Sequence, residues 1–266
     1  MKSKYLEYFN KISNIITNSQ TVSVIYNHVI RIHYILLKMS ISANDRLNSS
    51  DCNENVSVTH HYLIPSLSLR LQPQCPIIFV FDVDGTIARK KKNNILIRPG
   101  WEKLIGILNN LHAEVIIWTA GNSKHFCAIE SHLNFISGNK SMHKCQDFYL
   151  RHVLVREDWL DKDKNPTRIK DLDRLGRDTS LVLMIENNHK SGAKQPNNTL
   201  LVPSFDIDCD FEDEYVLSNV SKIIQIITLS IMSGRVSNVP DALNMCNRLG
   251  YIKKHSISFT RHIFSI

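Results

Sequence analysis

The sequence predicts an α/β fold in which a parallel β-sheet carries helices on both faces. Between residues 76 and 235, short continuous apolar segments alternate with segments of helical spacing, as in sheets whose strands are buried on both sides. Each apolar segment ends directly in polar residues, at the edge where open α/β sheets bind their ligands. The chain shows no internal repeat of the kind that builds solenoids.

The expected strands follow from the short apolar runs, and the expected helices follow from apolar residues at helical spacing. The apolar segments 77–81, 115–118 and 181–185 predict buried strands, and segment 152–155 predicts a strand in an inserted hairpin. Apolar residues at three- and four-residue steps predict helices over 101–111, 123–133 and 213–232. In the last helix, residues 216, 220, 223, 224 and 227 are expected to face inward.

Composition divides the chain into four parts. Residues 1–45 have helical spacing, and we expect an N-terminal helical extension that packs on its own domain or on a partner. Residues 46–75 are polar and rich in turn formers, which predicts a linker. The α/β domain is expected over 76–235, and residues 236–266 are expected to form a C-terminal tail.

Bulk composition narrows the classes of partner. The formal net charge of +7 favours anionic partners such as phosphoproteins, nucleic acid or acidic membrane surfaces, with a solvated basic surface as the alternative. The six cysteines form no C-x-x-C pair, so reduced thiols in an intracellular protein are expected, and zinc is not. The apolar stretch 22–39 is too short and too polar for a membrane span.

The first strand runs into a pair of carboxylates, Asp82 and Asp84, followed by Gly85. Residues i and i+2 of an extended backbone point the same way, so the two carboxylates repel each other unless a cation is present. A hard divalent ion with oxygen ligands, Mg²⁺ above all, would relieve that repulsion. One carboxylate could then attack phosphorus while the other transfers protons. A calcium-binding loop or a plain turn is the alternative.

Three further polar residues stand at strand ends or helix starts. Thr119 offers a hydroxyl, Lys170 a positive charge and Asn187 a side-chain oxygen. Taken singly, they could be a helix cap, a surface lysine and a turn residue. Their joint occurrence in this order favours a phosphate site with a metal ion.

At this point the chain resembles the haloacid dehalogenase superfamily, and within it the small phosphatases of the RNA polymerase II C-terminal domain. The resemblance covers roughly residues 76–232. It rests on the catalytic motifs and on 98–100 (Arg-Pro-Gly), 115–122, 152–158, 170–178 (Lys-Asp-Leu-Asp-Arg-Leu-Gly-Arg-Asp), 196–197 and 213–214. It implies a Rossmann-like sheet without a large cap.

The resemblance also implies roles for individual residues. Asp82 would be the nucleophile and Asp84 the general acid and base, with Thr119 and Lys170 holding the phosphate. The nucleophile loop and the second strand end would bind phosphoryl oxygens, through Val83, Gly85, Thr86 and Ala120. The metal ligands would be Asp82, Asp84, Asn187 and Glu186, and the cofactor Mg²⁺.

The sequence departs from the family pattern at the last motif. Glu186 stands where the family usually has aspartate, and Asn188-His189-Lys190 stands where Ser-Pro is usual. These departures put metal affinity, the local loop and substrate choice in doubt.

The expected function is a Mg²⁺-dependent aspartyl phosphatase that acts on phosphoserine or phosphothreonine in proteins, because an uncapped site admits protein side chains. The basic run 89–92 could attract an acidic or multiply phosphorylated substrate, or could be a solvated loop. One alternative is a binding or assembly protein with little turnover, such as the nucleocapsid-assembly proteins of insect DNA viruses that share this domain and act on a basic viral core protein. Another is a phosphatase of nucleic-acid 3′ ends. A nuclear location is favoured, with the virion or the mitochondrion as alternatives, and the oligomeric state is left open.

Overall fold

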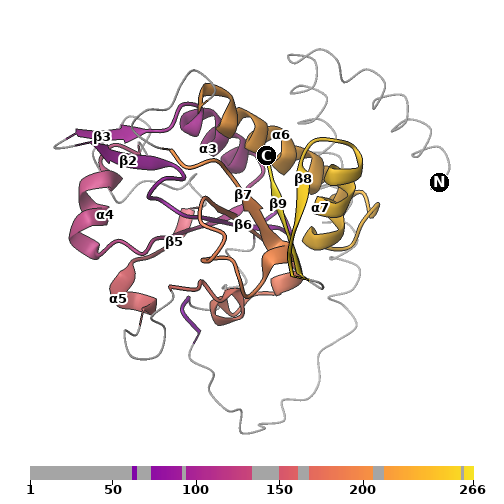
Figure 1. Ribbon diagram of the computed structural model, residues 1–266, viewed down its shortest axis with the longest axis horizontal. Helices are drawn as coiled ribbons and strands as arrows, with labels where there is room; N and C mark the ends of the chain where they lie inside the picture. Colours follow the sequence, from indigo (N-terminus) through magenta and orange to yellow (C-terminus); the bar gives the residue numbers. More distant parts are fainter. Residues whose placement is uncertain are drawn as a thin grey trace, which may run out of the picture. The chain divides into compact units, whose positions relative to one another are not determined.

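The computed structural model describes residues 62–64, 73–91, 94–133, 150–160, 168–205, 213–258 and 261–266. Its centre is a seven-stranded sheet in the order β5-β4-β1-β6-β7-β9-β8 (Figure 1). The predicted N-terminal extension lies outside the described residues.

The predicted strands form the middle of this sheet. They are β1 (Ile78–Phe81), β4 (Glu114–Trp118) and β6 (Val182–Glu186), and β1 pairs in parallel with both neighbours. From β1 the chain adds β4 and β5 on one side and β6 and β7 (Thr199–Leu201) on the other. The order therefore reverses beside β1, and such reversal points are where open α/β sheets bind ligands.

Helices α3 (Trp101–Asn110) and α6 (Asp213–Met232) pack on each other, and α3 packs on one face of the sheet through Trp101, whose ring meets Phe81 edge to face at 5.7 Å. The inward residues predicted for α6 are all buried. Helix α4 (Ser123–Glu130) follows β4 and has two buried residues, Phe126 and Ile129. The α/β class predicted from the alternating pattern is confirmed.

Short helical segments cover the other face. The buried side chains of α5 (Arg156–Trp159) and of the 3-10 helix η2 (Leu172–Leu175) pack there on alternate residues of β1, β4 and β6. Ile64 belongs to the same core, and the Leu63 N–H donates to the Arg174 carbonyl at 2.8 Å. The packed domain therefore includes residues 62–64, ahead of the boundary expected near 76.

Two sequence predictions are wrong in topology. Within the described residues, the segment around His152 pairs with the central sheet and not within a hairpin: β5 (Leu150–Leu154) runs parallel to β4 as an edge strand. Residues 236–266 are not a tail, because they form α7 (Val239–Arg248), β8 (Lys253–Ser258) and β9 (Arg261–Ser265). Strand β9 pairs in parallel with β7, and the closing β8–β9 hairpin extends the sheet. The long-range pairing that places both segments leaves no local periodic signal.

Between β1 and α3 the chain forms a hairpin of β2 (Ala88–Lys91) and β3 (Asn94–Ile97). The basic run thus lies mainly on a strand. The Arg89 guanidinium lies over the Phe205 ring, 4.4 Å from its centroid, and Lys90 is exposed. No second globular domain stands over the sheet end within the described residues.

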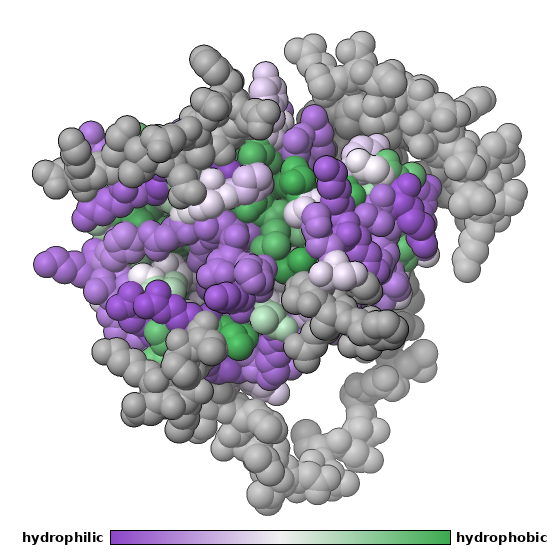
Figure 2. Space-filling model, viewed as in Figure 1, coloured by the Kyte–Doolittle hydropathy of each residue, from purple (hydrophilic) through white to green (hydrophobic). Residues whose placement is uncertain are grey.

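Hydrophilic residues dominate much of the described surface in one view, around a smaller central group of hydrophobic residues (Figure 2). The stretch Tyr215–Met232 of α6 is long and apolar enough to cross a membrane, and half of it is buried within the domain. Its packing against α3 and α7 is that of a core helix.

Candidate active site

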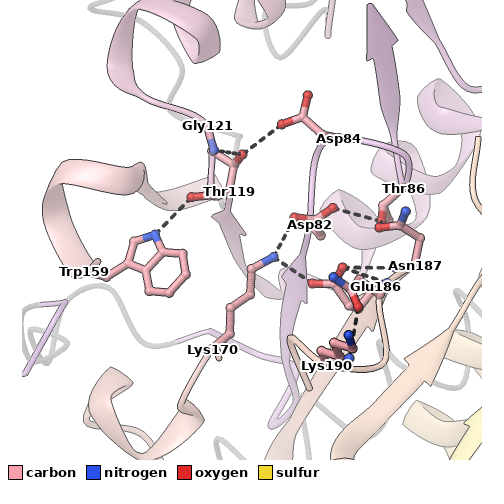
Figure 3. A network of polar contacts seen from close by, with 11 residues as sticks. Asp82, Asp84, Thr86, Thr119, Gly121, Trp159, Lys170, Glu186, Asn187 and Lys190 are labelled. Carbon is pink, nitrogen blue, oxygen red and sulfur yellow. Dashed lines mark hydrogen bonds and ion pairs between the residues drawn. The ribbon is translucent and has the colours of Figure 1, made fainter. Parts of the chain in front are cut away.

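The polar strand ends meet at the carboxyl end of β1. Asp82 follows β1 directly, and the Asp82 N–H donates to the Ile185 carbonyl of β6 at 3.0 Å. Figure 3 shows Lys170, Thr119, Glu186 and Asn187 converging around the loop that begins at Asp82. Groups spread over more than one hundred residues of sequence are thus brought into one site.

Asp82 and Lys170 form the buried centre of the site. Lys170 Nζ donates to Asp82 Oδ1 at 2.6 Å and to Glu186 Oε2 at 2.7 Å. Their side chains are 2% (Lys170), 9% (Asp82) and 2% (Glu186) exposed. The Lys170 N–H donates to the Ser191 carbonyl at 2.8 Å, which anchors the lysine backbone. Lys170 is therefore a fully buried ammonium group held between two carboxylates.

Burial and charge act against each other here. Burial raises the pKa of Asp82 to about 7, Lys170 opposes that rise, and the carboxylates of Glu186 and Asp84 add to it. Burial alone would lower the pKa of Lys170, but the Asp82 and Glu186 carboxylates raise it above its usual value. Lys170 thus stays charged, and its charge favours the ionised form of Asp82 that a nucleophile requires.

The nucleophile loop is held in a tight turn. Gly85 has φ +81°, and a Cβ there would overlap the side-chain amide of Asn187, so this position needs glycine. The Val83 carbonyl accepts from the N–H groups of Thr86 and Ala88 at 3.2 and 3.0 Å. The buried Arg98 donates to the Thr86 carbonyl at 3.1 Å and to the Pro203 carbonyl at 2.8 Å. Arg98 therefore joins the loop to the segment after β7.

Asp84 points to the open side. Its side chain is 45% exposed, Thr119 Oγ1 donates to Oδ2 at 3.2 Å, and His125 Nε2 lies 2.6 Å from Oδ1. The Gly121 N–H donates to Thr119 Oγ1 at 2.8 Å. Thr119 is not the N-cap of α4, because Asn122 fills that place and accepts from the His125 N–H. Asp84 is therefore accessible to a substrate that arrives from solvent, while the side chains of Thr119 and His125 hold its carboxyl group.

Oxygen donors gather beside Asp82. Thr86 Oγ1 lies 3.1 Å from Asp82 Oδ2 and 3.2 Å from Asn187 Oδ1, so a carboxylate and an amide oxygen share one small region. The Asn187 Nδ2 group donates to Ser204 Oγ at 3.1 Å, which turns the amide oxygen the other way. Such a set of hard oxygen donors fits Mg²⁺. No group of three or more His, Cys, Asp or Glu side chains suited to a metal ion occurs among the described residues.

Glu186 is occupied on both oxygens. Besides Lys170, it accepts from the N–H groups of Asn187 and Asn188 at 3.2 and 3.1 Å. Its longer side chain is therefore accommodated, and its contacts serve to position Lys170. The assignment of Glu186 as a metal ligand stays a prediction that these contacts do not favour.

The amides assigned to phosphate binding fall into two groups. The Gly85 N–H donates to the Ala88 carbonyl and the Thr86 N–H to the Val83 carbonyl, so both are used inside the loop. No hydrogen bond among the described residues uses the N–H of Val83 or Ala120. These last two amides are the ones available to phosphoryl oxygens.

Comparison with known families agrees with this geometry. The model of the NLI interacting factor-like phosphatases matches residues 61–235, well over half of the chain. The chain belongs to this family. This match confirms the resemblance at the level of a CTD-phosphatase-like family. The matched range begins at the packed segment 62–64 and ends before α7.

Comparison with solved structures and with curated sequences gives weaker similarities than the family match. One similar structure is the fission yeast RNA polymerase II CTD phosphatase Fcp1 bound to beryllium fluoride, with 15% identity, a TM-score of 0.36, and coverage of 66% of this chain and 56% of that one. Another is the 3-deoxy-D-manno-octulosonate 8-phosphate phosphatase of Moraxella catarrhalis with magnesium, phosphate and KDO, with 12% identity, a TM-score of 0.36, and coverage of 60% and 92%. This chain thus spans just over half of the yeast enzyme. No curated protein matches it significantly.

In this member of the NLI interacting factor-like family, sequence reasoning missed two residues of the site, Arg98 and His125, and one contact between predicted residues. Arg98 was noticed only as part of a motif, and the Lys170–Glu186 contact was not expected. His125 gave no signal except its place in the first turn of the helix after Thr119.

Two hollows, of about 480 and 610 Å³, lie away from Asp82, beside Tyr62–Ile64 and beside α7 and β8.

Proposed function

We propose that this protein is a Mg²⁺-dependent aspartyl phosphatase that acts on phosphoserine or phosphothreonine in a protein. One observation supports it above the others: Asp82 lies 2.6 Å from the buried Lys170, while Asp84, two residues on, is exposed and held by Thr119. This arrangement supports Asp82 as the attacking carboxylate and Asp84 as the one that exchanges protons with the surroundings.

The proposed reaction has two steps. First, an Asp82 carboxylate oxygen bonds to phosphorus as the bond to the serine oxygen breaks, and Asp84 gives its proton to that oxygen. Second, Asp84 takes a proton from water, whose oxygen bonds to phosphorus as the bond to Asp82 breaks. Inorganic phosphate leaves, and both aspartates return to their starting states.

The surroundings of Asp82 support both steps. Lys170 and the N–H groups of Val83 and Ala120, which no hydrogen bond among the described residues uses, would stabilise negative charge on the phosphoryl oxygens. The Asp82 carboxylate, the Asp84 carbonyl and the Asn187 side chain would hold Mg²⁺, which would supply further positive charge to the site. The contacts of Glu186 with Lys170 favour an intact enzyme over a binding protein that has only kept the fold.

The open site supports a protein substrate. Asp84 is 45% exposed and His125 28% exposed, and only the β2–β3 hairpin separates the nucleophile loop from α3. No cap covers the site within the described residues, so a phosphorylated side chain on a protein surface can approach it there. The exposed Lys90 lies on β2, six residues after Asp84, and its positive charge favours acidic or multiply phosphorylated segments.

The test is phosphate release from a phosphoserine peptide with Mg²⁺, with and without EDTA, for wild type and Asp82→Asn. We expect release that requires Mg²⁺ and falls by about 10⁴-fold or more in the variant, with circular dichroism showing that the variant is folded. A 3′-phosphorylated oligonucleotide tests the alternative substrate class. No release by folded wild type from the peptide or an aryl phosphate would reject the enzyme and favour a binding role.

A further inference from the structure

His125 lies against the open aspartate in a defined position. Its Nε2 is 2.6 Å from Asp84 Oδ1, the shortest polar contact that Asp84 makes. The His125 backbone is fixed in the first turn of α4, because its N–H donates to the N-cap Asn122 Oδ1 at 2.8 Å. The imidazole therefore approaches Asp84 from a rigid element.

The neighbouring backbone leaves room for this ring. Gly121 carries no side chain, and a Cβ there would lie 2.6 Å from His125 Cδ2. That Cβ would also lie 3.1 Å from Thr119 Oγ1. The glycine after β4 thus leaves room for both groups that contact Asp84. The His125 imidazole lies on Oδ1, and the Thr119 hydroxyl lies on Oδ2.

The contact contributes little to folding. The side chains of His125 and Asp84 are 28% and 45% exposed, and polar contacts between such exposed side chains stabilise proteins only slightly. A general acid, by contrast, contributes about 10²–10⁴-fold to a reaction, provided that its carboxyl group is correctly aligned. The consequence of the contact should therefore appear in catalysis.

We infer that His125 is a positioning residue for Asp84: with Thr119, it fixes the carboxyl group in the orientation that gives the proton to the leaving oxygen. With the proton of His125 on Nε2, each Asp84 oxygen accepts one hydrogen bond and keeps a second lone pair, so a proton can still sit on the side facing the substrate. This inference rests on the proposed function, in which Asp84 is the general acid.

Comparing two substrates with different leaving groups tests this role of His125. A serine alkoxide leaves poorly and needs the proton of Asp84, whereas p-nitrophenolate leaves well without it. The ratio kcat/KM reports the steps up to release of the leaving group, before the phosphoaspartate is hydrolysed. Loss of alignment at Asp84 should therefore lower kcat/KM for a phosphoserine peptide far more than for p-nitrophenyl phosphate.

The experiment compares four variants with wild type on both substrates, with thermal unfolding as the check on folding. His125→Ala is expected to lose about ten- to a hundredfold in kcat/KM on the phosphoserine peptide and less than about threefold on p-nitrophenyl phosphate. His125→Gln places an amide N–H near the position of Nε2 and should recover most of the loss. His125→Asn is too short to reach Asp84 and should not. His132→Ala, which removes an exposed histidine that contacts Ser131 and the Ala128 carbonyl, is the matched control.

The outcomes separate the two proposals. Equal losses on both substrates, an unchanged His125→Ala, or recovery by His125→Asn as good as by His125→Gln would overturn the positioning role while leaving the phosphatase in place. Absence of turnover by folded wild type on both substrates would reject the proposed function, and the role of His125 with it.

Discussion

Asp82 and Asp84 are two residues apart but lie in opposite environments. The Asp82 side chain is 9% exposed and bonded to a lysine that is itself 2% exposed, whereas the Asp84 side chain is 45% exposed and bonded to a half-buried histidine. Attraction between charges is strong where water is excluded and weak where it is not. Substitutions in the buried half of the site, around Asp82 and Lys170, should therefore lower both activity and stability. Substitutions in the open half, around Asp84 and His125, should lower activity alone.

The largest effect is expected at Lys170. Lys170→Met leaves Asp82 and Glu186 as unpaired buried carboxylates, so activity should be abolished and stability should fall by about 3–5 kcal/mol. Denaturant unfolding and phosphate release measure the two losses. Adding Glu186→Gln should restore part of the stability and none of the activity. A Lys170→Met protein as stable as wild type would show that the buried half lacks the proposed coupling.

Asp84→Asn should separate the two properties. Activity on a phosphoserine peptide is expected to fall about 10²–10⁴-fold because the general acid is lost, while the unfolding free energy changes by less than about 1 kcal/mol. Steady-state kinetics and urea unfolding on the same preparation check this. A large loss of stability would contradict the assignment of Asp84 to an open, weakly coupled half.

A smaller effect is expected at Asn187, on the border of the two halves. Asn187→Ala removes one of the oxygen donors gathered at Thr86, so the Mg²⁺ concentration for half-maximal activity should rise by roughly tenfold or more. A Mg²⁺ titration of phosphate release measures it. Ser204→Ala is the control, because it removes the partner of Asn187 Nδ2 and leaves the oxygen donor in place. Equal Mg²⁺ requirements in wild type and Asn187→Ala would rule out this ligand.

The smallest effect is expected far from the site, at Glu114. This buried carboxylate accepts from Arg177 at 2.9 and 3.1 Å. Burial alone would raise its pKa, but the His152 imidazole, whose Nε2 lies 3.5 Å from Oε1, and the Arg177 guanidinium hold the pKa below its usual value. A carboxyl group with a depressed pKa in the folded state stabilises the protein above the unfolded pKa, and this contribution is lost as pH falls below it.

Wild type should accordingly lose unfolding free energy as pH falls from about 5 to 3, by more than Glu114→Gln, which is less stable at pH 7 and lacks this titrating group. Urea midpoints measured across that range give the comparison. Parallel curves for the two proteins would mean that Glu114 does not contribute through its charge.

The sequence predicted the central strands and α3 well because their signals are local. An apolar run of four or five residues is enough to indicate a buried strand, and the inward face of α6 follows from its three- and four-residue steps. The segment around His152 and the last thirty residues were misjudged, because their place in the sheet depends on pairing with β4 and β7. Residues 62–64 (Tyr-Leu-Ile) were assigned to the linker because three apolar residues inside a polar, turn-rich segment give no periodic signal, although Ile64 is buried.

For the active site, the sequence indicated which side chains supply the chemical groups, but it did not indicate which residues form hydrogen bonds to those side chains. The sequence by itself determined that Asp82, Asp84, Thr119 and Lys170 follow strands or precede helical turns, since strand period and strand ends are local properties. Only the tertiary structure decided that Glu186 holds Lys170 and that His125 holds Asp84. Those contacts join residues 16 and 41 positions apart, and a distance of that kind is fixed by how the strands and helices pack, which no short sequence pattern encodes.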